Sequence, residues 1–325
     1  MKTVFVIGAG FSKEAGFPLT EEFTDEEKIT KIRSNLNETE RQRLDKVTGY
    51  FLNRIQEKYC KDNIESVLNH IAVADYLAME ATTNDAETYP SSQIFSDLLW
   101  YIARVLKESA KSTVPVEYEK FVKYAYDNKC PVISFNYDLI IEEALRKLNI
   151  ECDYGFDTIP IDNSLFLMKM HGSVNWAFCS KCENVVIFSG YEASNIVGGT
   201  SKCSVCNECT LETIIIPPIL YKDTFYKHPR YEDLIRQLWG FANDELVEAD
   251  KVVFIGFSMA ETDAYAQELF KFSSNMNKNV KYHLVTRPKS DKGIDNLVDR
   301  YEEVLVGNSI EVIKKPFCEY VNEIT

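Results

Sequence analysis

Val4-Phe5-Val6-Ile7-Gly8-Ala9-Gly10-Phe11-Ser12 is the stretch that decides the fold of this chain. Its apolar part belongs to a continuous run over residues 3–7, which is typical of a strand buried on both faces of a parallel sheet. The run ends directly at Gly8 and Gly10. A buried strand that closes on glycines and leads into a helix predicts a turn whose backbone can approach a phosphate closely.

Similar apolar runs recur along the chain, at 132–135, 165–168, 252–255 and 282–285. Helical patterns lie between several of them, for example over 139–148 and 264–272. Strands that alternate with helices predict a doubly wound parallel sheet, so the fold class expected is α/β and Rossmann-like.

Two insertions interrupt this alternation. Apolar residues at helical spacing predict helices within 20–128, where no convincing strand is found, and residues 110–116 suggest a turn between two of them. A second insertion carries closely spaced cysteines. The predicted domains are a nucleotide-binding sheet domain (1–19, 129–178 and 219–325), a helical insertion lobe (20–128) and a small metal-binding module (179–218).

The composition indicates a soluble globular protein, with 325 residues, 45% hydrophobic and 26% charged. A formal net charge of −14 argues against a nucleic-acid partner, because no basic surface is available to displace counterions from phosphates. No apolar run approaches the roughly 18 residues of a membrane span, and Met1-Lys2-Thr3 leads straight into a strand without a signal peptide. With nine cysteines that do not resemble a secreted disulfide scaffold, we expect a cytoplasmic protein.

The glycine loop departs from the dinucleotide motif of dehydrogenases, because Lys13 stands where the third glycine is needed. No acidic residue closes a second strand about 20 residues further on, so hydride transfer is disfavoured. The alternative interpretation of the loop is a tight turn without a ligand. A second loop over 255–263 also follows a buried strand, and its Gly256 and Ser258 could meet the same ligand from a neighbouring strand.

Three polar residues follow predicted strands and are the candidate catalytic groups. Asn136 could orient a water molecule or a carboxamide, whereas Asp138 could equally cap the next helix. His171 precedes Gly172 at a strand end, where it is a candidate general base near neutral pH. A structural histidine is the alternative.

Cys179-x-x-Cys182 and Cys203-x-x-Cys206 have the spacing of a tetrahedral zinc site. Four thiolates leave no open coordination position, so the expected zinc is structural. Cys206-x-x-Cys209 is also a possible pair, but we prefer Cys203 with Cys206, because Asn207 tolerates the left-handed turn that usually follows.

In this order the motifs resemble the sirtuin family, over residues 1–18 and about 129–316. The matching positions are Gly8-Ala9-Gly10-x-Ser12 with Gly16 and Pro18, Asn136-x-Asp138, His171-Gly172, the four cysteines and Gly256-x-Ser258. The resemblance implies NAD+ as the bound nucleotide. It also implies that Asn136, Asp138 and His171 act at the nicotinamide ribose.

The chain departs from deacetylating sirtuins in three places. Phe17-Pro18-Leu19-Thr20 lacks their Asp-Phe-Arg segment, Ile214-Ile215-Ile216-Pro217-Pro218 replaces their peptide-binding strand, and the helical insertion is additional. These features resemble bacterial stand-alone sirtuin-like proteins of antiphage defence. That resemblance implies an NAD+ glycohydrolase that releases nicotinamide and ADP-ribose.

Two other functions remain open at this stage, a protein deacylase or ADP-ribosyltransferase, and a non-catalytic NAD+ or ADP-ribose sensor. A toxic hydrolase has to be silent in healthy cells. We therefore expect regulation by a co-encoded partner protein or by homo-oligomerisation, with the helical lobe as the surface for it.

Overall fold

The computed structural model describes residues 1–56, 64–82, 88–111, 113–157, 161–197, 201–207, 211–217, 229–287 and 291–325. Its contacts divide the chain into two compact units. Unit 1 contains Met1–Phe17, Lys111–His171 and Pro229–Thr325, and unit 2 contains Pro18–Ala110 and Gly172–His228.

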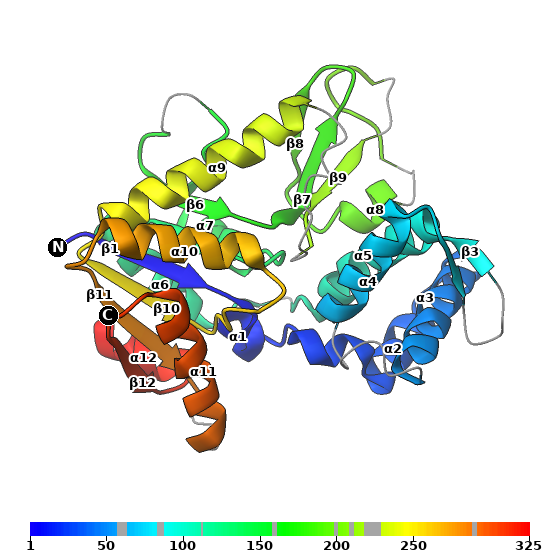
Figure 1. The fold of residues 1–325 in the computed structure, drawn as a ribbon. Helices are drawn as coiled ribbons and strands as arrows, with labels where there is room; N and C mark the ends of the chain where they lie inside the picture. The colour runs from blue at the N-terminus through cyan, green and yellow to red at the C-terminus, as the bar shows by residue number, and fades with distance from the viewer. Residues whose placement is uncertain are drawn as a thin grey trace. The chain divides into compact units, whose positions relative to one another are not determined.

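Unit 1 is built on a seven-stranded sheet in the order β12-β11-β10-β1-β4-β6-β5, and all of its neighbouring strands pair in parallel (Figure 1). The strands are β1 (Thr3–Ile7), β4 (Val132–Ser134), β5 (Glu151–Asp153), β6 (Ser164–Lys169), β10 (Lys251–Ile255), β11 (Lys281–Thr286) and β12 (Ile310–Lys314). The parallel Rossmann-like sheet predicted from the apolar runs is confirmed.

The strand order places the topological switch point beside β1. From β1 the chain leads to β4, then to β5 at the edge of the sheet and back to β6 between β4 and β5. It then crosses to β10 on the other side of β1 and continues through β11 to β12. In doubly wound sheets, ligands bind beyond the carboxyl ends of the strands at such a point. The loops that follow β10, β1, β4 and β6 therefore meet at one edge.

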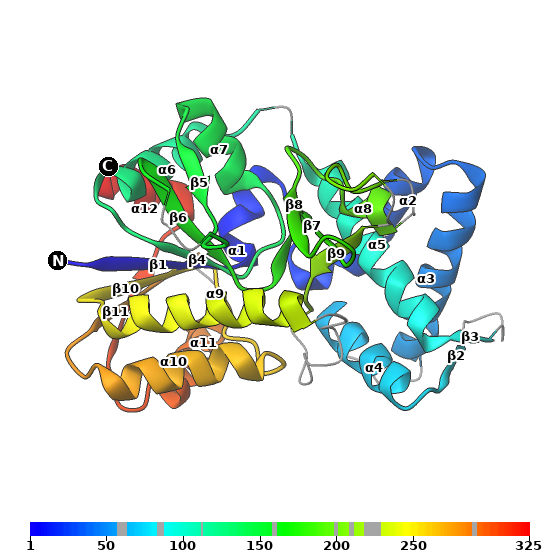
Figure 2. The ribbon, with the colours of Figure 1, turned by 90° about the horizontal axis from the view of Figure 1, so that it is seen from above.

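Helices cover both faces of this sheet. They are α1 (Ala9–Ser12), the 3₁₀ turn η1 (Lys13–Ala15), α6 (Val116–Asp127), α7 (Ile140–Leu148), α9 (Pro229–Val247), α10 (Ala264–Met276), α11 (Asp291–Val304) and α12 (Phe317–Ile324). Figure 2 shows α9, α10 and α11 on one side and α6, α7 and α12 on the other. Successive side chains along β1 point to opposite faces of the sheet, so each face has its own hydrophobic core. Val4 and Val6 pack with α9–α11 on one face, whereas on the other the Phe5 ring lies 5.0 Å from that of Phe121 in α6.

Unit 2 combines helices with a small sheet. Its elements are η2 (Thr20–Thr24), α2 (Glu26–Ser34), α3 (Glu38–Gln56), α4 (Ile64–Tyr76), β2 (Glu80–Thr82), β3 (Thr88–Pro90), α5 (Ser91–Ser109), β7 (Gly172–Cys179), β8 (Asn184–Ile187), α8 (Ala193–Val197) and β9 (Glu212–Ile215). Strands β8, β7 and β9 form an antiparallel sheet. Helix α5 packs on α8, which in turn packs on β7 and β9.

Three details differ from the sequence-based expectations. Within 20–128 the structure contains the antiparallel hairpin β2–β3, so the expectation of no strand there was wrong. Each of its strands has only three residues, too few for an alternating pattern to be recognised. Helix α6 belongs to unit 1 rather than to the helical insertion, and the insertion forms one compact unit with the cysteine-bearing segment. Strands β5 and β12 were not predicted.

Candidate functional site

The two glycine loops pack against each other at the switch point. Gly10 N donates to the Gly256 carbonyl at 2.9 Å, and Gly256 has a left-handed φ of +60°. A Cβ on Gly8 would lie 2.7 Å from Phe257 Cα, and one on Gly256 would lie 2.2 Å from Phe11 N. This close backbone contact by itself explains why these positions are glycines.

The other loop positions named by the resemblance have distinct surroundings. Ser12 is buried and Ala9 begins α1, whereas Ser258 is exposed. Gly16, with φ +100°, ends η1 by donating its N–H to the Lys13 carbonyl at 3.0 Å. Pro18 is the first residue of unit 2.

Tyr118 of α6 anchors the segment that follows the first glycine loop. Its hydroxyl donates to the Phe11 carbonyl at 2.7 Å and accepts from Ala15 N at 3.2 Å. The phenol is buried, which raises its pKa and keeps it neutral. One buried hydroxyl thus satisfies two backbone groups of the loop, where a phenylalanine would leave both without that partner.

Asn136 is held in one orientation by the loop after β1. Its Nδ2 donates to the Gly8 carbonyl at 2.9 Å and to Ser12 Oγ at 3.0 Å, and the residue is buried. Because a carbonyl only accepts, the amide nitrogen has to face Gly8. Both amide hydrogens are thereby used, and what Asn136 can offer a ligand is its Oδ1 acceptor.

Asp138 lies next in this network. Its Oδ1 accepts from Ile140 N at 3.1 Å, where α7 begins, and its carboxyl also has a hydrogen bond with the Ser12 side chain. Burial raises the pKa of Asp138, opposed by the positive charge of Lys169 and by the Ser12 and Ile140 hydrogen bonds. The bond to the main chain of α7 is an Asx turn at the start of that helix, whose N-cap is Leu139. Asp138 is also connected through Ser12 to Asn136.

Lys169, at the end of β6, is a buried cation that the sequence analysis missed. Its Nζ donates to the Asp138 carbonyl at 2.6 Å and lies 2.8 Å from Oε1 of Glu142 in α7. Tyr154 donates to the same carboxylate oxygen at 3.1 Å. Only 1% of the Lys169 side chain and 8% of the Glu142 side chain are exposed. This pair holds the main chain of the loop that carries Asn136 and Asp138.

His171 lies two residues after β6 and pairs with Asp263, a second residue that the sequence analysis missed. His171 Nε2 lies 2.6 Å from Asp263 Oδ2, and the two side chains are 5% and 3% exposed. The imidazole is edge-on to Phe135, at a centroid distance of 5.2 Å, and 6.1 Å from the Tyr137 ring. The glycine that follows, Gly172, approaches β9 rather than a ligand, because its Cβ would lie 1.9 Å from the Ile214 carbonyl.

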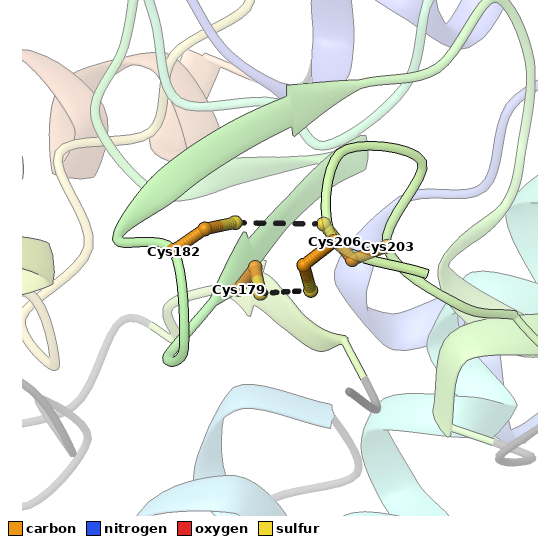
Figure 3. A group of neighbouring side chains, drawn as sticks. All are labelled: Cys179, Cys182, Cys203 and Cys206. Carbon is orange, nitrogen blue, oxygen red and sulfur yellow. Dashed lines mark hydrogen bonds between the residues drawn. The ribbon is translucent and has the colours of Figure 1, made fainter. Parts of the chain in front are cut away.

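Cys179, Cys182, Cys203 and Cys206 gather in unit 2, and all four sulfur atoms lie within 4.8 Å of one another (Figure 3). Sγ of Cys179 is 3.7 Å from that of Cys206, and Sγ of Cys182 is 3.6 Å from that of Cys203. Tetrahedral zinc with Zn–S bonds of about 2.3 Å requires sulfur atoms about 3.8 Å apart. The cluster could therefore bind zinc. Cys209 lies outside the described residues.

The structure brings together the loops that follow four adjacent strands. They contribute Gly256 and Asp263 after β10, Gly8 and Ser12 after β1, Asn136 and Asp138 after β4, and His171 after β6. Asp263 did have a sequence signal, because it lies three residues before Ala266 at the start of a predicted helix. Such a position is typical of a helix cap, and the capping bond to Ala266 N is present at 3.3 Å.

The sheet and this cluster of loops define a Rossmann-like protein with polar and titratable groups at the carboxyl edge of its sheet, the edge where proteins of this fold bind nucleotides. The family model of the SIR2-like domain matches residues 131–313, more than half of the chain, so the chain belongs to the SIR2-like domain family. The match includes Asn136, Asp138, His171, Gly256 and the four clustered cysteines. No curated protein sequence matches the chain.

Solved structures with a similar backbone include Sir2Tm bound to a propionylated peptide, at 13% identity and a TM-score of 0.44, covering 99% of this chain and 91% of that one. A second structure, described as the structural basis for the mechanism and regulation of Sir2 enzymes, has 13% identity and a TM-score of 0.48, and the match covers 99% of this chain and 90% of that one. A Sir2 homologue–NAD complex has 13% identity, a TM-score of 0.47 and coverages of 99% and 87%.

In the described part of the chain, none of the helices combines the length and apolar character that crossing a bilayer requires.

Proposed function

We propose that this protein is an NAD+ glycohydrolase, which uses water to cleave NAD+ into nicotinamide and ADP-ribose. The observation that supports this most is the fixed amide of Asn136 at the carboxyl edge of the sheet, in a loop next to that of His171. A hydrolase needs a group that positions water and a group that accepts its proton.

Asn136 is proposed to accept a hydrogen bond at Oδ1 from the attacking water or from a ribose hydroxyl. Its two bonds to Gly8 and Ser12 hold that oxygen in place before the substrate binds. Asp138 is proposed to orient Asn136 through the Ser12 hydroxyl, which can donate to the carboxylate while it accepts from the amide.

His171 is the proposed base. As the bond between the ribose carbon and the nicotinamide nitrogen breaks, that bond's electrons leave with nicotinamide and positive charge develops on the ribose. The water oxygen then bonds to the same carbon, and His171 accepts the proton that is released. General base catalysis of this kind contributes about 10²–10⁴-fold.

The remaining groups are proposed to bind NAD+ and to stabilise the fold. Gly8, Ala9, Gly10, Ser12, Gly16, Pro18, Gly256 and Ser258 are the proposed nucleotide-binding positions, taken from the family resemblance. The four clustered cysteines are proposed to hold a structural zinc ion in unit 2.

We also propose a cellular role, depletion of NAD+ in a cytoplasmic antiphage response. In that role the enzyme would be held inactive until triggered, by a co-encoded protein or by homo-oligomerisation, and the helices of unit 2 are the proposed contact surface. The support is the additional helical insertion that the resemblance associates with such proteins. Co-expression with the neighbouring genes, followed by a measurement of cellular NAD+ after infection, tests this role.

The decisive experiment is nicotinamide release from NAD+ by the purified protein, compared with His171→Ala and Asn136→Ala. His283→Ala is the matched control, because His283 is also a histidine of this sheet next to a carboxylate. It lies in β11, with its Nε2 3.6 Å from Oε2 of Glu311. We expect both site variants to remain folded and to lose release, and the control to retain it. Release at the wild-type rate by both site variants would show that the assignment is wrong.

Two outcomes would favour the alternative functions. Deacylation of an acetyl-lysine peptide would favour a protein deacylase. Tight NAD+ binding without turnover, with the co-encoded protein present, would favour a sensor.

A further inference from the structure

The two carboxylate oxygens of Asp263 have different partners, the main chain of α10 and the side chain of His171. Oδ1 accepts from Ala266 N at 3.3 Å in the first turn of α10, while Oδ2 lies 2.6 Å from His171 Nε2. The positive end of the α10 dipole stabilises a negative charge at this position. Asp263 is therefore suited to remain ionised even though it is almost completely buried.

The consequence for His171 follows from the chemistry of the imidazole. A carboxylate can only accept, so the proton of the neutral ring lies on Nε2, and the basic lone pair lies on Nδ1. When the ring accepts a proton, the adjacent carboxylate stabilises the positive charge. The rings of Phe135 and Tyr137, from the loop after β4, pack beside the imidazole.

We propose that Asp263 is the positioning residue of His171, which selects its tautomer and stabilises its protonated form during the reaction. The inference rests on the NAD+ hydrolysis proposed above. The β10–α10 connection would then contribute to the site twice, because it carries both Gly256 and Asp263, the partner of the proposed base. Among the described residues, the titratable groups close to the ring include Asp263 from this connection and the Tyr137 phenol from the loop after β4.

The competing explanation is that Asp263 only caps α10, and Asp263→Asn separates the two. Asparagine caps a helix about as well as aspartate, so the fold should survive, but it has no charge and can donate to Nε2. Asp25→Asn is the matched control, because Asp25 caps α2 by accepting from Glu27 N at 2.9 Å and lies in the other unit.

We expect Asp263→Asn to lower kcat for nicotinamide release by about 10²–10⁴-fold, with KM changed less than about threefold, and Asp25→Asn to match wild type. Loss of the carboxylate makes the imidazolium less stable. The acid limb of the profile of kcat/KM against pH should therefore move to lower pH in Asp263→Asn. A capping residue would not move that limb. Unchanged kcat and an unchanged limb would overturn the proposal.

A second measurement keeps this test independent of the proposed reaction. Nitrogen-15 NMR of the histidine rings, with His171 assigned by its loss in His171→Ala, reports the tautomer and the titration midpoint. We expect the Nε2–H tautomer in wild type, and a lower midpoint or a changed tautomer in Asp263→Asn. Identical spectra and midpoints would overturn the positioning role. If wild type released no nicotinamide even with the co-encoded protein present, but showed the expected difference in the spectra, the hydrolase would fail and the positioning role would stand.

Discussion

The buried pair of Lys169 and Glu142 leads to the sharpest prediction about stability. Lys169→Met keeps most of the side-chain volume but removes the cation that lies 2.8 Å from Glu142 Oε1 and donates to the Asp138 carbonyl. Glu142 is then left as a buried carboxylate with the Tyr154 hydroxyl and no cation. Removing one partner of a buried pair costs about 3–5 kcal/mol, because the remaining charge stays desolvated.

The expected drop in Tm follows from that cost. For a domain of about 150–250 residues, 1 kcal/mol changes Tm by about 2–4 °C, so Lys169→Met should lower it by about 6–20 °C. The same substitution should reduce nicotinamide release, because the Asp138 carbonyl loses its partner and the loop that carries Asn136 is released. The double variant Lys169→Met/Glu142→Gln should recover most of the stability, since no buried charge is then unpaired.

Urea unfolding of the wild type, both single variants and the double variant measures this coupling. Lys147→Met is the matched control, because Lys147 also binds a carboxylate and a carbonyl, Glu119 at 2.8 Å and Val114 at 3.1 Å. Its pair is 41% and 27% exposed, so the loss should be within about 1 kcal/mol. If Lys169→Met cost no more than Lys147→Met, or if the double variant were as unstable as Lys169→Met, the reasoning would be refuted.

Three further predictions concern Asp138, Gly256 and the cysteines. Burial raises the pKa of Asp138, so ionising this carboxyl lowers the stability of the folded protein above the ordinary carboxyl range and has no such cost below about pH 4. Asp138→Asn should therefore have a higher Tm than wild type at pH 7, and the difference should disappear towards pH 4. The same variant should lose nicotinamide release. Gly256→Ala should lower the free energy of unfolding by about 1–3 kcal/mol, because Gly256 has a φ of +60° and its Cβ would meet Phe11 N. Gly240→Ala is the control: a Cβ there would meet nothing within 4 Å, so urea unfolding should show no change or a gain of up to about 1 kcal/mol. Cys179→Ser should lose the stoichiometric zinc that metal analysis detects in wild type and should have a lower Tm, whereas Cys318→Ser should retain the metal. A strong chelator should lower the Tm of wild type in the same way. A zinc-free wild type with an unchanged Tm would contradict the structural role.

Much of the site could be predicted from the sequence because it depends on local patterns. Continuous apolar runs marked the strands of the sheet, and the residues directly after them, Asn136 and His171, necessarily lie at its carboxyl edge. The spacing of the four cysteines likewise predicted a cluster, in which two pairs of sulfur atoms lie 3.7 and 3.6 Å apart, close to the separation that zinc requires. The edge strands β5 and β12 are short or alternate with charged residues, so their apolar signal was weak.

Only the tertiary structure decided which side chains meet. Lys169 and Asp263 are charged residues, which sequence alone places on the surface, and both are buried because a partner distant in sequence compensates them. Asp263 is 92 residues from His171, and no local pattern reports such a distance. The sequence by itself determined five of the seven strands of the parallel sheet, the family, and the candidate base and asparagine. The three-dimensional packing determined how the base is paired, how the asparagine is oriented, and why the glycines of two separate loops have no side chain.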